Sequence, residues 1–147
     1  MYYLVINAQL TFFMIEKIHK SDEEWKKVLN PEQFEVMRES GTEAPFSCIW
    51  EELREGEYHC AACDLPLFQS RAKFESGTGW PSFFDPFAPN HLEYVEDISH
   101  GMGRTEVRCA RCESHLGHVF DDGPPPSGKR YCINSIALKF FPKNNEK

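Results

Sequence analysis

Two short stretches, Cys60-Ala-Ala-Cys63 and Cys109-Ala-Arg-Cys112, decide how this chain folds. Each is a C-x-x-C pair, the spacing at which two thiolates hold one tetrahedral ion, so together they predict a zinc site with four thiolate ligands. Because this ligand set leaves no open coordination position, we expect the zinc to be structural. A redox-active C-x-x-C of the thioredoxin kind is the alternative, and two matched pairs in one domain count against it.

Length and composition indicate one globular domain. The chain has 147 residues, enough to bury a core without disulfides, and 14% of them are aromatic. Its net charge of −7, from 16 basic and 23 acidic side chains, argues against a nucleic-acid partner, whose phosphates attract basic patches. Three disulfides in a secreted protein are another use of six cysteines. The lack of a clear secretory signal favours the metal site.

We interpret residues 1–17 as an N-terminal arm, residues 18–142 as the domain and residues 143–147 as a C-terminal tail. The arm is fairly apolar, but it has no basic n-region and no clean cleavage site. It also carries Asn7 and Glu16, which argue against a transmembrane span. We expect an over-called start with Met14 as the natural beginning, and a weak signal peptide is the alternative. The expected location is the cytoplasm, without a membrane partner.

The domain is predicted to open with two or three short helices. Ser21-Asp-Glu-Glu24 is typical of a capping box, and Asn30-Pro31 of an N-cap and first helical residue, with Gly41 ending the second helix. Later in the chain, short aromatic or β-branched runs alternate with turn residues and predict strands. The runs are Glu57–Cys60, Leu92–Val95, Thr105–Cys109, His118–Phe120 and Tyr131–Phe140. The expected fold is mainly β, a β-rich α+β domain with a small antiparallel sheet, N-terminal helices and a four-cysteine zinc clip.

Cys132 lies outside both pairs and has neighbours suited to a reactive thiol. In a strand, Arg130 and Asn134 would share a face with it. A guanidinium lowers the pKa of a thiol, and an amide can donate to an oxyanion. Upstream, His115 and His118 are candidate proton donors. An inert buried cysteine beside two structural histidines is the alternative interpretation.

The segment from Phe74 to Phe84 is rich in glycine but lacks the Lys-Ser/Thr of a phosphate loop. It presents Trp80 beside a proline, either as a core residue or as the wall of a pocket for a small apolar group such as a methyl. The same pocket would suit a binding module without catalysis, in which Trp80 and Phe83 form a cage and Cys132 is inert. A zinc-ribbon nucleic-acid adaptor is a weaker alternative, because the net charge of the chain is acidic. A Cys-His hydrolase is also weaker, because the zinc site and a second leftover thiol fit redox chemistry better.

Four segments resemble the B-type methionine sulfoxide reductases, as do the two C-x-x-C pairs. The segments are Gly-Thr-Glu-x-Pro-Phe at 41–46, Ser-Gly-x-Gly-Trp-Pro-Ser-Phe at 76–83, His-Leu-Gly-His-Val-Phe-Asp-Asp-Gly at 115–123 and Arg-Tyr-Cys-Ile-Asn-Ser at 130–135. The resemblance runs from about Ile18 to Phe141. It implies a β-rich fold with one structural zinc, and a thiol-based reductase of the R epimer of methionine sulfoxide, mainly peptide-bound.

The resemblance also implies roles for single residues. Cys132 would be the nucleophile, and Trp80 would receive the methyl group of the substrate. The residues implied to bind or protonate the substrate are His115, His118 and Asn134, with further contacts expected from Phe83, Arg130 and Asp122.

One position departs from the family pattern. Many members carry a resolving cysteine in Ser-Gly-Cys-Gly-Trp, where this chain has Thr78. Cys48 has no other assignment, so our hypothesis is that it is a relocated resolving thiol. Attack by Cys132 on the sulfoxide would leave a sulfenic acid, with which Cys48 would form a disulfide that thioredoxin or a similar dithiol reduces. In the alternative, Cys48 is passive and an external thiol reduces the sulfenic acid directly.

Overall fold

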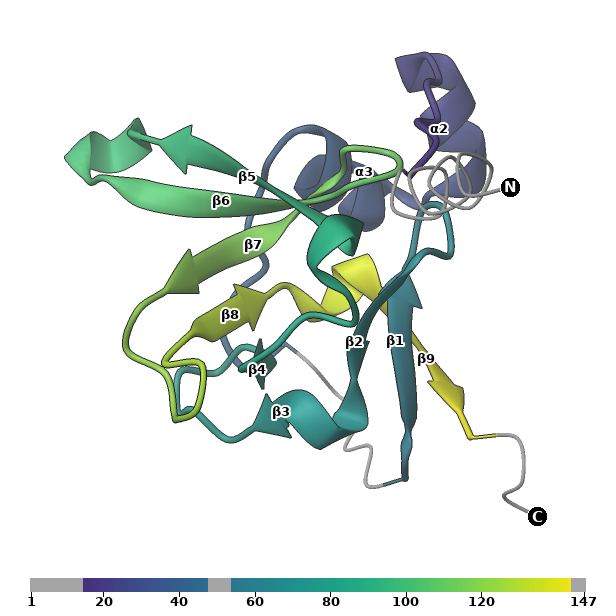
Figure 1. Cartoon of the computed structure of the whole chain (residues 1–147). Coiled ribbons are helices and arrows are strands. Elements are labelled where there is room, and N and C mark those ends of the chain that lie inside the picture. Colours follow the sequence, from purple (N-terminus) through teal and green to yellow (C-terminus); the bar gives the residue numbers. More distant parts are fainter. Residues whose placement is uncertain (1–14, 48–53, 144–147) are drawn as a thin grey trace, which may run out of the picture.

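The computed structural model describes residues 15–47 and 54–143, which form two antiparallel sheets preceded by two α-helices (Figure 1). The predicted β-rich α+β class is therefore confirmed. Neither helix in these two ranges is long and apolar enough to cross a membrane.

The two helices begin where the capping signals predict. In α2 (Asp22–Val28) the Ser21 hydroxyl accepts from the Glu24 N–H at 3.2 Å, and in α3 (Pro31–Arg38) the Asn30 side chain accepts from the Gln33 N–H at 2.7 Å. Both are complete capping boxes, which satisfy N–H groups that the first turn leaves unpaired. Trp25 is fully buried in the core.

The predicted stop at Gly41 lies two residues beyond the C-cap of the second helix, Glu39. Helix α3 ends at Arg38, and Ser40 takes the left-handed conformation with φ 58°. The Gly41 N–H then closes the turn on the Glu35 carbonyl at 3.0 Å. The chain thus uses a serine where glycine is the usual residue.

The strands form two sheets that share one hydrophobic core. The three-stranded sheet has the order β2 (Pro66–Gln69), β1 (Gly56–Cys60), β9 (Leu138–Pro142). The six-stranded sheet has the order β3 (Lys73–Phe74), β4 (Ser82–Phe83), β8 (Arg130–Ile133), β7 (His115–Phe120), β6 (Arg104–Cys109), β5 (Leu92–Asp97). Short 3-10 turns η1 to η4 cover Ser70–Ala72, Pro89–His91, Ser99–Gly101 and Ser135–Ala137.

Aromatic rings join the two sheets in a common core. Phe68 of β2 stacks on Phe83 of β4 with ring centroids 4.3 Å apart, and Tyr58 of β1 meets the same ring edge-on at 5.2 Å. These three side chains are fully buried. Offset and edge-on aromatic pairs add to the free energy gained from burial alone.

The predicted strand Tyr131–Phe140 was wrong as one element. It is two strands, β8 and β9, which belong to different sheets and are separated by the turn η4. Its alternating pattern is misleading because Ala137 and Leu138, adjacent in the chain, are both buried. Asn134 therefore lies just beyond the end of β8.

Candidate active site and metal centre

The two C-x-x-C pairs form matching knuckles at the ends of β1 and β6. In one, the Cys60 N–H donates to the Leu65 carbonyl at 2.8 Å; in the other, the Cys109 N–H donates to the Ser114 carbonyl at 3.0 Å. Asp64 and Glu113, one residue beyond each pair, both adopt positive φ. Each knuckle turns the chain so that both of its thiols point to the same place.

The four thiols fit a tetrahedral metal ion. Their Sγ atoms all lie within 4.8 Å of one another, with 3.7 Å between Cys60 and Cys112 and 3.5 Å between Cys63 and Cys109. Zn–S bonds of about 2.3 Å in a tetrahedron place the sulfurs about 3.8 Å apart. The donor set therefore offers four sulfur ligands at the spacing that a tetrahedral divalent cation needs.

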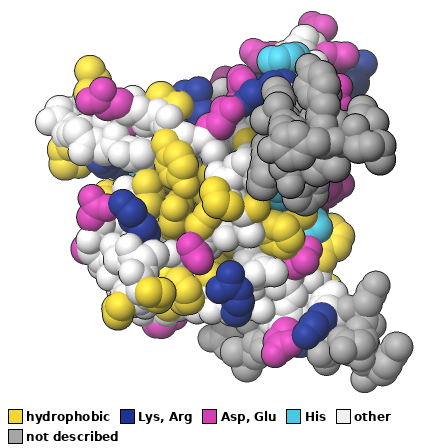
Figure 2. Space-filling model, viewed as in Figure 1, with side chains coloured by type: hydrophobic (Ala, Val, Ile, Leu, Met, Phe, Trp, Pro, Cys, Tyr) yellow, Lys and Arg dark blue, Asp and Glu magenta, His cyan; other side chains and the backbone are white. Residues whose placement is uncertain are grey.

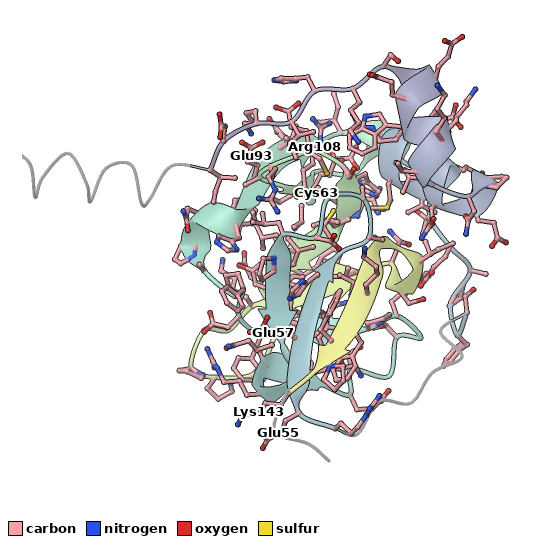
Figure 3. All side chains as sticks on the ribbon, turned by 90° about the vertical axis from the view of Figure 1, so that its right-hand side faces the viewer. Glu55, Glu57, Cys63, Glu93, Arg108 and Lys143 are labelled. Carbon is pink, nitrogen blue, oxygen red and sulfur yellow. The ribbon has the colours of Figure 1, made fainter. Side chains whose placement is uncertain are left out.

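The cluster of four cysteines joins the two sheets at one end of the molecule. In Figure 3, Cys63 lies near Arg108 of β6, whereas Glu55 and Lys143 lie at the opposite end of the three-stranded sheet. That opposite end carries a hollow of about 880 Å³, bordered by Glu57 and Lys143 and by no cysteine or histidine among the described residues. A smaller pocket contains Cys132 and His118.

A pocket of about 280 Å³ opens over β7 and β8. It brings together five of the residues singled out in the sequence, namely Trp80, His118, Arg130, Cys132 and Asn134. Its other lining residues are Thr42, Thr78, Arg104, Gly117 and Phe120.

Strand register explains why these side chains meet. Cys132 of β8 lies opposite His118 of β7 and Ser82 of β4, so all three side chains point to one face of the six-stranded sheet. The strands approach closely at Gly117, where an added Cβ would lie 2.0 Å from the Cys132 carbonyl oxygen. Only glycine fits this position.

The Cys132 thiol is set between opposing effects on its pKa. Burial raises this pKa, while the Arg130 guanidinium and a hydrogen bond with Thr78 act to lower it. Burial is the larger effect, so the pKa of the thiol lies above its usual value. The expectation that Arg130 lowers the pKa is right in direction, but Arg130 does not outweigh burial.

Arg130 itself is held from two sides. Its Nε and Nη2 donate to the two carboxylate oxygens of Asp122 at 2.9 and 3.1 Å, and its guanidinium lies 4.4 Å from the ring centroid of Phe120. Asp122 does not line the pocket; its side chain is 66% exposed. The contact that the structure gives Asp122 is therefore with Arg130, and it fixes the direction of the guanidinium.

The two histidines each contact a carboxylate. His118 Nε2 lies 2.8 Å from Asp97 of β5, and His115 Nδ1 lies 2.7 Å from Glu106 of β6. A register shift between β6 and β7 brings His115 to the same face as His118, with their ring centroids 5.5 Å apart. His115 is only 4% exposed and does not line the pocket, and burial lowers its pKa. His118 is the histidine that reaches the pocket.

Comparison with known proteins identifies the fold. Residues 29–142 match the model of the SelR domain. The chain belongs to the SelR domain family. It is 56% identical over 131 residues to the peptide methionine sulfoxide reductase MsrB of Pseudomonas entomophila, covering 88% of this chain and 100% of that protein. It is 58% identical over 124 residues to the protein of the same name from Methanosarcina barkeri, covering 84% and 87% of the two chains.

A solved structure gives a weaker likeness. The crystal structure of the Mis18 'Yippee-like' domain aligns with 63% of this chain at a TM-score of 0.49 and 18% identity. This likeness is too distant to bear on function.

Phe83, another residue predicted to contact the substrate, does not line the pocket either. Phe83 is fully buried on the core face of β4, behind the pocket, where it stacks on Phe68. Cys48 lies outside the described residues.

Sequence reasoning missed several side chains that organise the pocket. The Glu43 carboxylate accepts from the Ser135 N–H at 2.7 Å and the Ile136 N–H at 3.1 Å, just beyond the strand of Cys132. The Glu43 carbonyl accepts from Trp80 Nε1 at 3.0 Å. Glu43 stands in the segment 41–46 that resembles the family, and this was its only signal. No sequence signal pointed to Asp97, because its partner His118 lies on another strand.

Proposed function

We propose that this chain is a peptide-methionine (R)-S-oxide reductase, with Cys132 as its nucleophile. Its relatives carry the name of methionine sulfoxide reductases, and the chain is accordingly an oxidoreductase acting on a sulfur group. The observation that carries the proposal is the pocket in which Cys132 lies beside Trp80, His118 and Asn134. A peptide-binding module without catalytic activity does not require a thiol flanked by a guanidinium and a histidine.

The first step joins sulfur to sulfur. The Cys132 thiolate attacks the sulfoxide sulfur while His118, hydrogen-bonded to Asp97, provides a proton to the sulfoxide oxygen. The substrate S–O bond and the transient S–S bond then break as the oxygen passes to Cys132, which becomes a sulfenic acid, and methionine leaves with both of its S–C bonds intact. The cysteine sulfur is oxidised by two electrons and the substrate sulfur is reduced by two.

The remaining pocket residues orient the substrate. Trp80, fixed by its hydrogen bond to Glu43, offers an indole wall to the S-methyl group. The Asn134 Nδ2 donates to the Leu116 carbonyl at 2.9 Å, so its side chain is held in place at the pocket wall. A fixed wall on one side and a fixed proton donor on the other would accept one sulfoxide epimer, and we assign the R epimer.

We propose that Cys48 resolves the sulfenic acid. Condensation of the two side chains releases water and forms a Cys48–Cys132 disulfide, which thioredoxin or a similar dithiol reduces by exchange. Phe46, two residues before Cys48, is bonded through its N–H to the Gly79 carbonyl at 2.6 Å, next to Thr78 in the pocket. The described chain just before Cys48 therefore contacts the edge of the pocket, which supports the proposal.

We propose one structural zinc per chain, held by Cys60, Cys63, Cys109 and Cys112. Zinc at this site would clamp the end of β1 to the end of β6. It has no role in the chemical step, because the four thiolates fill its coordination sphere.

Turnover of blocked methionine R- and S-sulfoxide, with dithiothreitol as reductant, tests the proposal. We expect turnover of the R epimer alone, and its loss in Cys132→Ser. Cys48→Ser should retain activity with dithiothreitol and lose it with thioredoxin. Failure of reduced, zinc-loaded wild type to reduce either epimer would refute the enzyme assignment. Detection of only external mixed disulfides after oxidation would refute the role of Cys48.

A further inference from the structure

Apolar side chains are exposed on both sides of the Cys132 pocket. The three most exposed large apolar residues in the described part of the chain are Phe46, Ile98 and Met102, at 77%, 72% and 54%. Single exposed apolar residues are common, but a group of them around one pocket indicates a surface that binds a ligand or another polypeptide.

Ile98 and Met102 stand at the tip of the β5–β6 hairpin, on either side of the turn η3. The hairpin closes with Asp97 opposite Arg104. Asp97 contacts the pocket residue His118, and Arg104 lines the pocket, so the tip lies at the pocket rim. Figure 1 shows this hairpin extending beyond the rest of the sheet, and Figure 2 shows apolar side chains at its tip.

Phe46 stands at the opposite rim. Its ring lies against Gly79, where an added Cβ would come within 2.9 Å of a ring atom, and Gly79 joins two pocket residues, Thr78 and Trp80. The backbone of Phe46 has φ 64°, a conformation that is rare for bulky residues. Strained residues of this kind persist where the surrounding structure holds them, and they concentrate at functional sites.

The two apolar groups lie on opposite sides of the pocket along the sheet. Trp80 leads into β4, the pocket lies over β8 and β7, and the hairpin begins at β6, in the sheet order β4-β8-β7-β6. A pocket of about 280 Å³ accommodates one side chain. A polypeptide whose sulfoxide side chain fills it must therefore continue across both rims.

We infer that Phe46 on one side and Ile98 with Met102 on the other are subsites for apolar side chains that flank the oxidised methionine in a peptide substrate. This inference rests on the proposed function and specifies its substrate class. Burial of apolar surface at both rims lowers the free energy of the bound peptide, so peptides with apolar neighbours are preferred over peptides with polar neighbours.

The test compares two blocked peptides that differ only in the residues beside a methionine R-sulfoxide, leucine in one and serine in the other. For wild type we expect kcat/KM for the leucine peptide to exceed that for the serine peptide by about tenfold, the factor that burial of about one partly exposed apolar side chain provides. In Ile98→Ser/Met102→Ser this ratio should fall toward one, and in Phe46→Ser to an intermediate value. Because a ratio is measured, a general loss of activity does not imitate the effect.

Val28→Ser is the matched control, since Val28 is 53% exposed on α2 and lies outside the pocket. Its ratio should equal that of wild type. A wild-type ratio near one, with normal turnover of both peptides, overturns the inference and leaves the proposed function intact. A ratio that stays at the wild-type value in both Phe46→Ser and Ile98→Ser/Met102→Ser has the same meaning. Absence of turnover of both peptides and of the blocked amino acid overturns the proposed function itself.

Discussion

At the scale of single residues, Cys132 shows how burial and charge compete. Burial protects a thiol from solvent but raises its pKa, and Arg130 offsets part of that rise. Asp122 keeps the guanidinium in place, and Arg130 in turn lowers the pKa of Asp122. The exposed Asp122 thereby helps to hold the charge that acts to lower the pKa of Cys132.

Arg130→Met should make Cys132 less reactive near neutral pH. Removing the positive charge takes away an effect that lowers the pKa of Cys132, so the thiolate should form only at a higher pH than in wild type. The measurement is the rate of alkylation of Cys132 by iodoacetamide as a function of pH, followed by mass spectrometry of the peptide that contains it. Arg71→Met, outside the pocket, should leave the midpoint unchanged. A midpoint for Arg130→Met at or below the wild-type value would contradict this account.

Glu43→Ala should destabilise the protein by about 2 kcal/mol, because two N–H groups and a hydroxyl beyond β8 lose their common acceptor. Urea denaturation measures the change. The exposed Glu39 at the end of α3 provides the control, and Glu39→Ala should cost about 0.5 kcal/mol or less. Equal losses in the two variants would show that the Glu43 contacts contribute nothing specific.

At the scale of elements, the pairing of β7 with β8 builds the pocket. The two strands approach at Gly117, and their register sets His118 opposite Cys132. A shift of one residue would turn Cys132 to the core face and empty the pocket of its thiol.

Gly117→Ala should therefore lower the free energy of unfolding by about 3 kcal/mol, since the new Cβ would meet the Cys132 carbonyl 2.0 Å away. Reductase activity should fall with it, because relief of the clash moves β8. Gly103→Ala is the control, as a Cβ there meets nothing within 4 Å. The two variants can be compared by thermal unfolding and by turnover of blocked methionine R-sulfoxide. A Gly117→Ala variant as stable and active as Gly103→Ala would remove the role given to close strand approach.

Elements that depend on local signals could be predicted, and one that depends on distant pairing could not. The capping residues Ser21 and Asn30 bond to N–H groups only three residues further on, so the sequence pattern predicts where α2 and α3 begin. The run Tyr131–Phe140 has the composition of a single strand, yet β8 pairs with β4 and β7 while β9 pairs with β1. Because the two halves of this run pair in different sheets, the strand must be interrupted between them, and residue propensity does not encode that interruption.

At the scale of the whole molecule, the cysteine cluster couples the two sheets.

Metal analysis should find one zinc per chain. Removal of the zinc by a chelator should lower the midpoint of thermal unfolding, because binding free energy that is lost on unfolding contributes to stability. Cys60→Ser should lower both zinc content and stability. Cys132→Ser should keep one zinc per chain and the wild-type midpoint. Full zinc content in Cys60→Ser would exclude Cys60 as a ligand.

The sequence by itself determined the family, the mainly β class, the grouping of four cysteines and the helix starts. These features rest on motifs or on contacts only a few residues apart. The tertiary structure decided that His118 reaches the pocket while His115 is buried, through partners 21 and 9 residues away, and that Glu43 meets Ser135 across 92 residues. It also turned Phe83 toward the core. Such outcomes depend on strand register and burial, which are properties of the assembled sheet and not of any short stretch of chain.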